Sequence, residues 1–227
     1  MALIVSIETA TKVCSVALHA ENQLIATQTL CVEKSHAESL LSAIAHLMAI
    51  SPYKKADLAA IAVSSGPGSY TGLRIGVSTA KGLCLALDIP LIAVSTLEAM
   101  AYGMEPYNVT RALLCPMIDA RRMEVYCLLA DSQHHILVPT HAQIIDQHSF
   151  QTWLVDYPIL FFGDGVAKCK SSLSHHSHAL FVDHVYPQAH HIGALAYAKF
   201  QKAAFEDLTS FAPSYLKPFQ GKLTPKV

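Results

Sequence analysis

Residues 64–87 read Ser-Ser-Gly-Pro-Gly-Ser-Tyr-Thr-Gly-Leu-Arg-Ile-Gly-Val-Ser-Thr-Ala-Lys-Gly-Leu-Cys-Leu-Ala-Leu, and this stretch decides the fold of the chain. The apolar run 58–63 before it predicts a buried strand that leads through a glycine-rich loop into a long helix. Such a loop leaves backbone N–H groups at a helix N-terminus, where the helix dipole favours an anion. The stretch therefore indicates either a nucleotide-binding loop or a tight structural turn.

The two phosphate-binding patterns with a known mechanism do not fit this loop. A P-loop has Lys-Ser or Lys-Thr directly after its last glycine, whereas Leu73 and Arg74 follow Gly72. The dinucleotide pattern requires glycine in its sixth place, which Thr71 occupies when the count begins at Gly66. The candidate residues of the nucleotide or structural loop are Gly66, Gly68, Thr71, Gly72 and Arg74.

The composition indicates a soluble cytoplasmic protein that lacks a basic field. Hydrophobic residues make up 52% of the chain, charged residues 15%, and the net charge is −1, so the whole chain would not hold RNA by charge alone. Residues 1–6 lack the positive start of a signal peptide, and Asp88 and Pro90 interrupt the longest apolar stretch. The six cysteines contain no Cys-x-x-Cys pattern, which predicts reduced core thiols.

Hydrophobic runs predict a similar order of elements twice. In the first half, strands at 3–7, 13–18 and 24–30 precede a helix that begins at Ser35, and a strand, the long helix and a strand at 91–94 follow. The second half predicts strands at 112–118, 125–130, 136–138, 159–162 and 180–182, a short helix at 150–155 and a closing helix at 192–208.

Two such halves predict an α/β fold of two RNase H-like lobes, the plan of the actin, sugar kinase and Hsp70 superfamily. Each lobe should contain a mixed sheet with flanking helices. The turn-rich segment 102–107 is the expected junction, so residues 1–107 should form the N-terminal lobe and residues 108–227 the C-terminal lobe.

Further motifs accompany the glycine stretch in both halves. They are Leu3–Leu18, Lys34–Glu38, Asp119–Tyr126, Gly163–Gly165 and Pro213–Lys217. Together with residues 64–87 they resemble the TsaB family, the bacterial subunit of the machinery that makes N6-threonylcarbamoyladenosine next to the tRNA anticodon.

The resemblance implies a non-catalytic cytoplasmic subunit that has no activity alone and supports a metal-bearing TsaD-type catalytic subunit. A TsaE-type ATPase would assist, tRNA would be reached only through the complex, and no membrane would be involved. A homodimer is implied when the partner is absent. The resemblance implies no tightly bound cofactor in this chain, whereas the assembled complex could bind ATP or ADP. The alternative is an enzyme of the same superfamily, either an ATP-binding phosphotransferase or a metallopeptidase-like protein.

The residues at the catalytic positions argue against both enzymes. Phosphotransferases of this plan have a carboxylate and a glycine hairpin after the first strand, and here Glu8 is present without that glycine. Glu8 also departs from the aspartate usual in the family, so a capped turn or a buried acid competes with a catalytic role. Thr96 and Met100 stand where the TsaD-type subunit has its metal-binding His-x-x-x-His pair, and both are poor ligands for such a metal. We therefore predict no catalytic residue and no metal site.

The thirteen histidines show no ligand spacing, and we expect the groups 134–135, 175–178 and 190–191 to be solvated loop residues. Ser35 and Glu38 form a capping-box pattern, which leaves His36 in an exposed first turn.

Two helices of the first half each carry a second stripe of mostly small residues, opposite their inner faces. These stripes are Ser42, Ala45 and Ala49 on the first helix, and Ile75, Thr79, Gly82 and Ala86 on the long helix. Small residues let helix backbones approach closely. The resemblance implies a four-helix interface with the partner, and the alternative is that both stripes pack inside one lobe.

Overall fold

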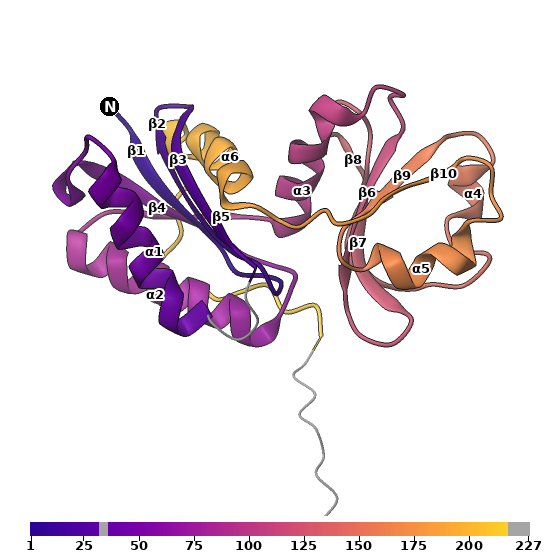
Figure 1. The fold of residues 1–227 in the computed structure, drawn as a ribbon, viewed down its shortest axis with the longest axis horizontal. Coiled ribbons are helices and arrows are strands. Elements are labelled where there is room, and N and C mark those ends of the chain that lie inside the picture. Colours follow the sequence, from indigo (N-terminus) through magenta and orange to yellow (C-terminus); the bar gives the residue numbers. More distant parts are fainter. Residues whose placement is uncertain (32–35, 218–227) are drawn as a thin grey trace, which may run out of the picture.

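The computed structural model describes residues 1–31 and 36–217, which form two five-stranded mixed sheets with helices on both faces (Figure 1). The strand order is β3-β2-β1-β4-β5 in the first sheet and β10-β9-β6-β7-β8 in the second. Each sheet therefore has an antiparallel part built from its first three strands and a parallel part from its last two. This arrangement confirms the predicted fold class.

The first sheet consists of β1 (Leu3–Glu8), β2 (Cys14–Ala20), β3 (Gln23–Leu30), β4 (Leu58–Ser64) and β5 (Leu91–Val94). Every residue of β1 and β2 is buried, because the sheet is covered on both faces, and this explains the continuous apolar runs. On one face, Val5 and Ile7 pack with helices α1 (His36–Ile50) and α2 (Tyr70–Leu87). On the other face, Ile4 packs with α6 (Ala189–Gln201).

The second sheet consists of β6 (Leu113–Asp119), β7 (Glu124–Ala130), β8 (Ile136–Ile144), β9 (Ile159–Phe162) and β10 (Ala179–Val182). One face packs against α4 (Gln151–Leu154) and α5 (Val166–Leu173), the other against α3 (Thr96–Met104). Short 3-10 helices, η1 (Lys55–Asp57) and η2 (Glu105–Tyr107), precede β4 and follow α3.

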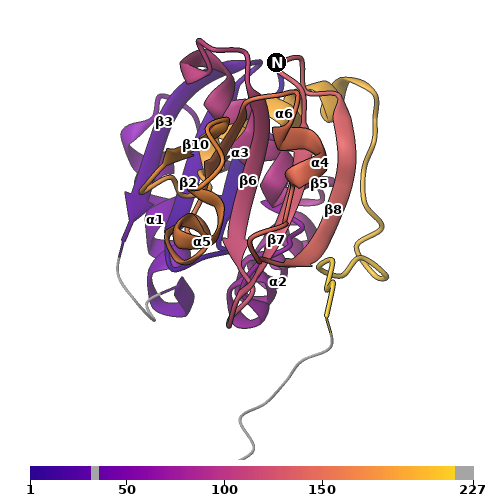
Figure 2. The same ribbon diagram turned by 90° about the vertical axis from the view of Figure 1, so that its right-hand side faces the viewer.

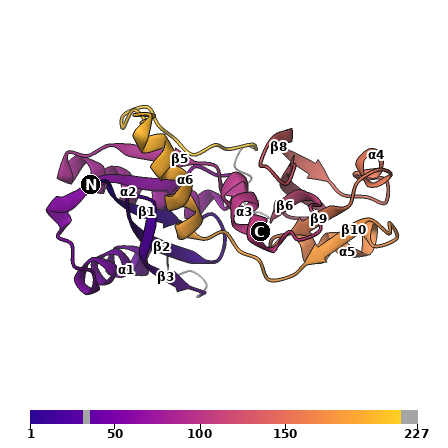
Figure 3. The same ribbon diagram turned by 90° about the horizontal axis from the view of Figure 1, so that it is seen from above.

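Two helices cover the sheet of the other half of the chain. Helix α3 extends into the expected junction at 102–107 and packs on β6 and β7 of the second sheet, whereas α6 follows the second sheet and packs on β1, β2, β4 and β5 (Figure 3). The division at residues 107 and 108 separates the two sheets but not their helices. As domain limits, 1–107 and 108–227 remain a prediction.

Several element boundaries differ from the prediction. The closing helix occupies residues 189–201 instead of 192–208, because Ala203 adopts a positive φ of 50° and Glu206 then pairs with the edge strand β5 through Leu91. The strand expected at 136–138 continues to Ile144, and the short helix expected at 150–155 covers only Gln151–Leu154. Helix α5 was not predicted, although Val166, Cys169 and Leu173 carry a helical pattern of buried residues.

The described residues add two general findings. None of their helices is long and apolar enough to span a membrane. All six cysteines are free thiols, and five of them are buried as expected for core residues. Cys31 is exposed, so the prediction of a core thiol is wrong there.

Candidate functional site

Glu8 ends β1 as a fully buried acid in a tight turn. Its Oε1 accepts hydrogen bonds from the Ala10 N–H at 2.6 Å and the Ser64 hydroxyl at 3.0 Å. Burial raises the pKa of Glu8 to about 7, since the surrounding protein penalises the charged form more than these hydrogen bonds favour it. The geometry fits the capped, buried acid among the alternatives for this residue.

The glycine loop packs directly on the turn that follows Glu8. A Cβ atom at Gly68 would lie 2.5 Å from the Ala10 carbonyl oxygen, and one at Gly72 would lie 2.1 Å from the Thr9 carbonyl oxygen. The Ser69 N–H also donates to the Ala10 carbonyl at 2.6 Å. Protein backbone therefore fills the space beside these glycines, which supports the structural reading of the loop over a phosphate cradle.

The five candidate loop residues separate into two groups. The three glycines lie in the close contact between the loop and the neighbouring backbone, and Gly66 has a positive φ of 102°. They are Gly66, Gly68 and Gly72. Thr71 and Arg74 lie on the exposed side of the first turns of α2. The Arg74 guanidinium lies 4.2 Å from the centre of the Tyr70 ring, and its Nε donates to the Tyr215 hydroxyl at 3.3 Å.

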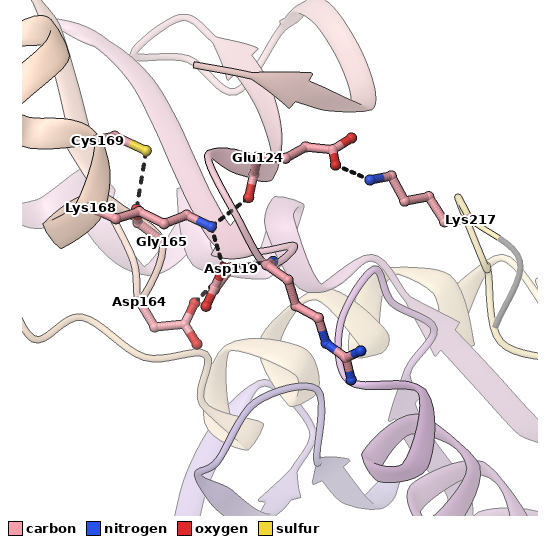
Figure 4. A network of polar contacts seen from close by, with 8 residues as sticks. Asp119, Glu124, Asp164, Gly165, Lys168, Cys169 and Lys217 are labelled. Atoms are coloured by element: carbon pink, nitrogen blue, oxygen red, sulfur yellow. Dashed lines mark hydrogen bonds and ion pairs between the residues drawn. The ribbon is translucent and has the colours of Figure 1, made fainter. Parts of the chain in front are cut away.

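A polar network joins β6, β7 and α5 of the second sheet (Figure 4). The Lys168 Nζ pairs with the Asp119 carboxylate and donates to the Glu124 carbonyl at 2.6 Å. The Asp119 N–H donates to Asp164 Oδ1 at 3.0 Å, and burial raises the pKa of Asp164. The segments 119–126 and 163–165, which the sequence shows only as family motifs, meet where β6 and β9 end.

The tail after α6 links this network to the glycine loop. The Ser214 N–H donates to the Ser65 carbonyl at 2.7 Å, the Tyr215 ring lies 4.7 Å from the Tyr70 ring, and Lys217 pairs with the Glu124 carboxylate. Figure 2 shows the tail running down one side of the molecule to the level of α2. The segment 213–217, marked only as a motif in the sequence, thus connects the two sheets.

The two positions that correspond to metal ligands in a TsaD-type subunit lie inside the protein. Thr96 and Met100 are buried residues of α3, the Thr96 N–H donates to the Gly66 carbonyl at 3.0 Å, and Met100 packs in the core against the second sheet. Within residues 1–31 and 36–217, no group of three or more His, Cys, Asp or Glu side chains could hold a metal ion.

Some of the histidine predictions were wrong. His36 is buried rather than exposed, because its Nε2 donates to the Thr11 carbonyl at 2.9 Å, and Ser35, the predicted capping-box partner of Glu38, lies outside the described residues. His190 and His191 are half-buried in the first turn of α6, not in a loop, and desolvation lowers the pKa of His191 to about 4. His175, by contrast, is exposed in a turn, as expected.

The stripe residues of α1 and α2 lie on an outward face, which we call the helix face. Ser42, Ala45, Ala49, Gly82 and Ala86 are exposed, whereas Ile75 and Thr79 are half-buried. Apolar side chains of the same two helices are also exposed, among them Leu41 at 56%, Ile50 at 63% and Leu85 at 79%. A soluble monomer rarely exposes so many apolar side chains along neighbouring helices, so this face is a candidate docking surface.

Comparisons with known proteins give one consistent picture. Residues 24–223 match the family described as TsaD, tRNA N6-adenosine threonylcarbamoyltransferase. The tRNA threonylcarbamoyladenosine biosynthesis protein TsaB of Bacillus subtilis is 35% identical over 70% of this chain and 70% of its own length. The protein of that name from Escherichia coli is 42% identical, over 54% of this chain and 52% of its own. A crystal structure of a Pseudomonas aeruginosa protein with similarity to peptidase YeaZ superposes with a TM-score of 0.83 at 22% identity, covering 96% of this chain and 100% of that one.

Proposed function

Because the chain belongs to the TsaB family, a branch of the family that the TsaD model describes, we propose that it docks a TsaD-type catalytic subunit through the helix face. The chain takes part in tRNA threonylcarbamoyladenosine biosynthesis. Its role in that process, in this proposal, is to stabilise and orient the catalytic subunit without contacting the reacting atoms.

The observation that carries the proposal is the exposure of the helix face. Ala45 and Gly82 are exposed at the centres of two neighbouring helices, and a Cβ atom at Gly82 would meet nothing within 4 Å. Helices that expose small residues can pack closely against two helices of another protein. The exposed Leu41 and Leu85 would supply apolar area to such an interface.

The enzyme alternative has less support. A phosphotransferase needs room for phosphate beside Glu8, and the backbone of Thr9 and Ala10 occupies that room against Gly68 and Gly72. A metallopeptidase needs ligands at positions where Thr96 and Met100 are buried in the core. The relatives are likewise named for tRNA modification.

The remaining expectations belong to the same proposal. In the cytoplasm, a TsaE-type ATPase would join the complex, and ATP or ADP would be held there and not by the isolated chain. Without its partner, the chain would form a homodimer through the same helix face, since exposed apolar side chains favour self-association.

The test uses two substitutions on the helix face. Ala45→Arg and Gly82→Arg place a large cation at exposed positions, so both variants should fold normally and lose partner binding and dimerisation. Ala198→Arg, an exposed alanine of α6, is the matched control and should bind normally. Circular dichroism reports folding, and size-exclusion chromatography with and without the TsaD-type protein reports assembly. Normal binding by both variants would place the interface elsewhere, and unfolding of both would mean that the stripes belong to the core.

A further inference from the structure

The hairpin loop between β6 and β7 exposes two arginines in an unfavourable backbone conformation. Arg121 has a φ of 68° and Arg122 a φ of 49°, in the left-handed region that side chains with a Cβ atom rarely adopt. Both residues are exposed, and no ion pair of the described residues involves an arginine. Glycine would adopt this backbone conformation without strain. Strained residues of this kind are concentrated at functional sites, which points to a function for the arginine side chains.

The residues around the loop hold it in this conformation. Asp119 Oδ1 accepts a hydrogen bond from the Arg121 N–H at 2.8 Å and also pairs with Lys168 (Figure 4). The Lys168 Nζ donates to the Glu124 carbonyl at 2.6 Å, and Lys217 pairs with the Glu124 carboxylate. The Asp119 and Glu124 carboxylates are thus paired with lysines, and no ion pair of the described residues occupies the two guanidinium groups.

The tail brings an aromatic ring to Arg74 of α2 and a lysine to the strand that follows the hairpin loop. Lys217 pairs with Glu124, which lies three residues after Arg121 in the sequence. Tyr215, two residues before Lys217, has its ring 4.7 Å from the Tyr70 ring and accepts a hydrogen bond from Arg74. Tyr215 is 37% exposed. The tail therefore connects the helix that carries Arg74 with the strand that follows Arg121 and Arg122, in a chain whose net charge is −1.

We infer that Arg74, Arg121, Arg122 and Tyr215 form a surface that binds tRNA directly in the assembled complex. The inference rests on the proposed function, in which this chain supports a tRNA-modifying subunit. Arginine side chains form paired hydrogen bonds to phosphate, and exposed aromatic rings stack with unpaired bases. An acidic protein surface would explain the arginines, but the exposed ring and the place in tRNA modification favour RNA.

The first experiment measures tRNA affinity as a function of salt, for the complex with the TsaD-type protein and for the full chain alone. Arg121→Glu/Arg122→Glu should weaken binding by about tenfold or more and reduce the slope of log affinity against log salt by about 2. The control is Lys54→Glu/Lys55→Glu, which changes the net charge equally at the exposed N-cap and first residue of η1 and should leave affinity nearly unchanged. Equal effects of the two double variants, or none from the arginine variant, would overturn the inference.

The second experiment separates an RNA role from a structural one. Arg121→Gly and Arg122→Gly relieve the strained backbone, so melting temperature should stay level or rise while tRNA affinity falls. A lower melting temperature with unchanged affinity would assign the arginines to stability and refute the RNA surface.

Partner binding is followed by size-exclusion chromatography in the same samples, which keeps the two proposals distinguishable. The arginine variants should still co-elute with the TsaD-type protein. Loss of co-elution would mean that the surface binds protein instead of RNA. If the wild-type chain failed to bind that partner and yet bound tRNA through Arg121 and Arg122, the docking proposal would fail and the RNA surface would stand.

Discussion

The carbonyl oxygen of Thr9 lies so close to Gly72 that a Cβ atom at position 72 would stand 2.1 Å from it. The turn after the first strand and the loop before α2 are therefore packed against each other. The contact leaves no room for a side chain at position 72, so packing against the turn requires glycine there. The conformation of the loop is thus coupled to α2, one of the two helices of the proposed docking surface.

Replacing Gly68 with valine should destabilise the protein by about 2–4 kcal/mol, because the new side chain would overlap the Ala10 carbonyl oxygen. Gly82→Val is the matched control, since a Cβ atom there meets nothing within 4 Å. Urea unfolding followed by circular dichroism gives both free energies of unfolding. Similar values for the two variants would contradict the close packing of the loop on the turn.

The ionisation of Glu8 should make stability depend on pH. Its pKa is about 7 in the folded protein and 4.5 ordinarily, so the folded state holds a proton that the unfolded state releases between these values. The contribution of this proton to the free energy of unfolding is fully present below pH 4.5 and is lost as the pH rises through about 7. The free energy of unfolding should therefore fall by up to about 3 kcal/mol over this range.

Glu8→Gln removes this titration, so its free energy of unfolding relative to wild type should increase between pH 5 and pH 8. Glu98→Gln, an exposed residue of α3, serves as the control and should show a constant difference. A constant difference for Glu8→Gln as well would mean that Glu8 is already ionised at pH 5.

Helix α6 should be loosened from the first sheet by the substitution Gly193→Ala. A Cβ atom there would lie 2.2 Å from His19 Nδ1 and 2.7 Å from Ser6 Oγ, so the helix must move outward. We expect a loss of about 1–3 kcal/mol and faster proteolysis within residues 189–201. Ala198→Ser, on the exposed side of the same helix, should behave like wild type. Unchanged proteolysis of the Gly193 variant would show that the contact is easily relieved.

Removing the Tyr215 ring should loosen the tail around Ser214 but change the stability of the whole protein only slightly. Tyr215→Ala removes the ring contact with Tyr70 and the hydrogen bond from Arg74, both at the surface, so the free energy of unfolding should change by about 1 kcal/mol or less. Hydrogen exchange at the Ser214 amide should accelerate, because that amide is bonded to the Ser65 carbonyl. Tyr157→Ala, another half-exposed ring, should leave this amide unaffected. Equal exchange rates in both variants would show that Tyr215 does not hold the tail.

The two sheets and the stripes of the helix face could be predicted from local sequence patterns. Strands β1 and β4 are continuous apolar runs because both faces of the sheet are covered, and that pattern is visible without any tertiary information. The stripes on α1 and α2 could be read from helical spacing alone, since residues three and four apart share a side of a helix. The motifs that identify the family are likewise local in sequence.

Contacts between segments that are far apart in the sequence became visible only in the tertiary structure. Helices α3 and α6 cover each other's sheets, and no periodicity within a helix specifies which sheet it will contact. His36 is buried because its ring reaches Thr11, 25 residues earlier, and the closing helix stops early because Glu206 pairs with Leu91. The contacts of Tyr215 with Arg74 and of Lys217 with Glu124 exist only because the tail returns to α2 and β7. Such contacts depend on how the whole chain packs, which local propensity does not encode.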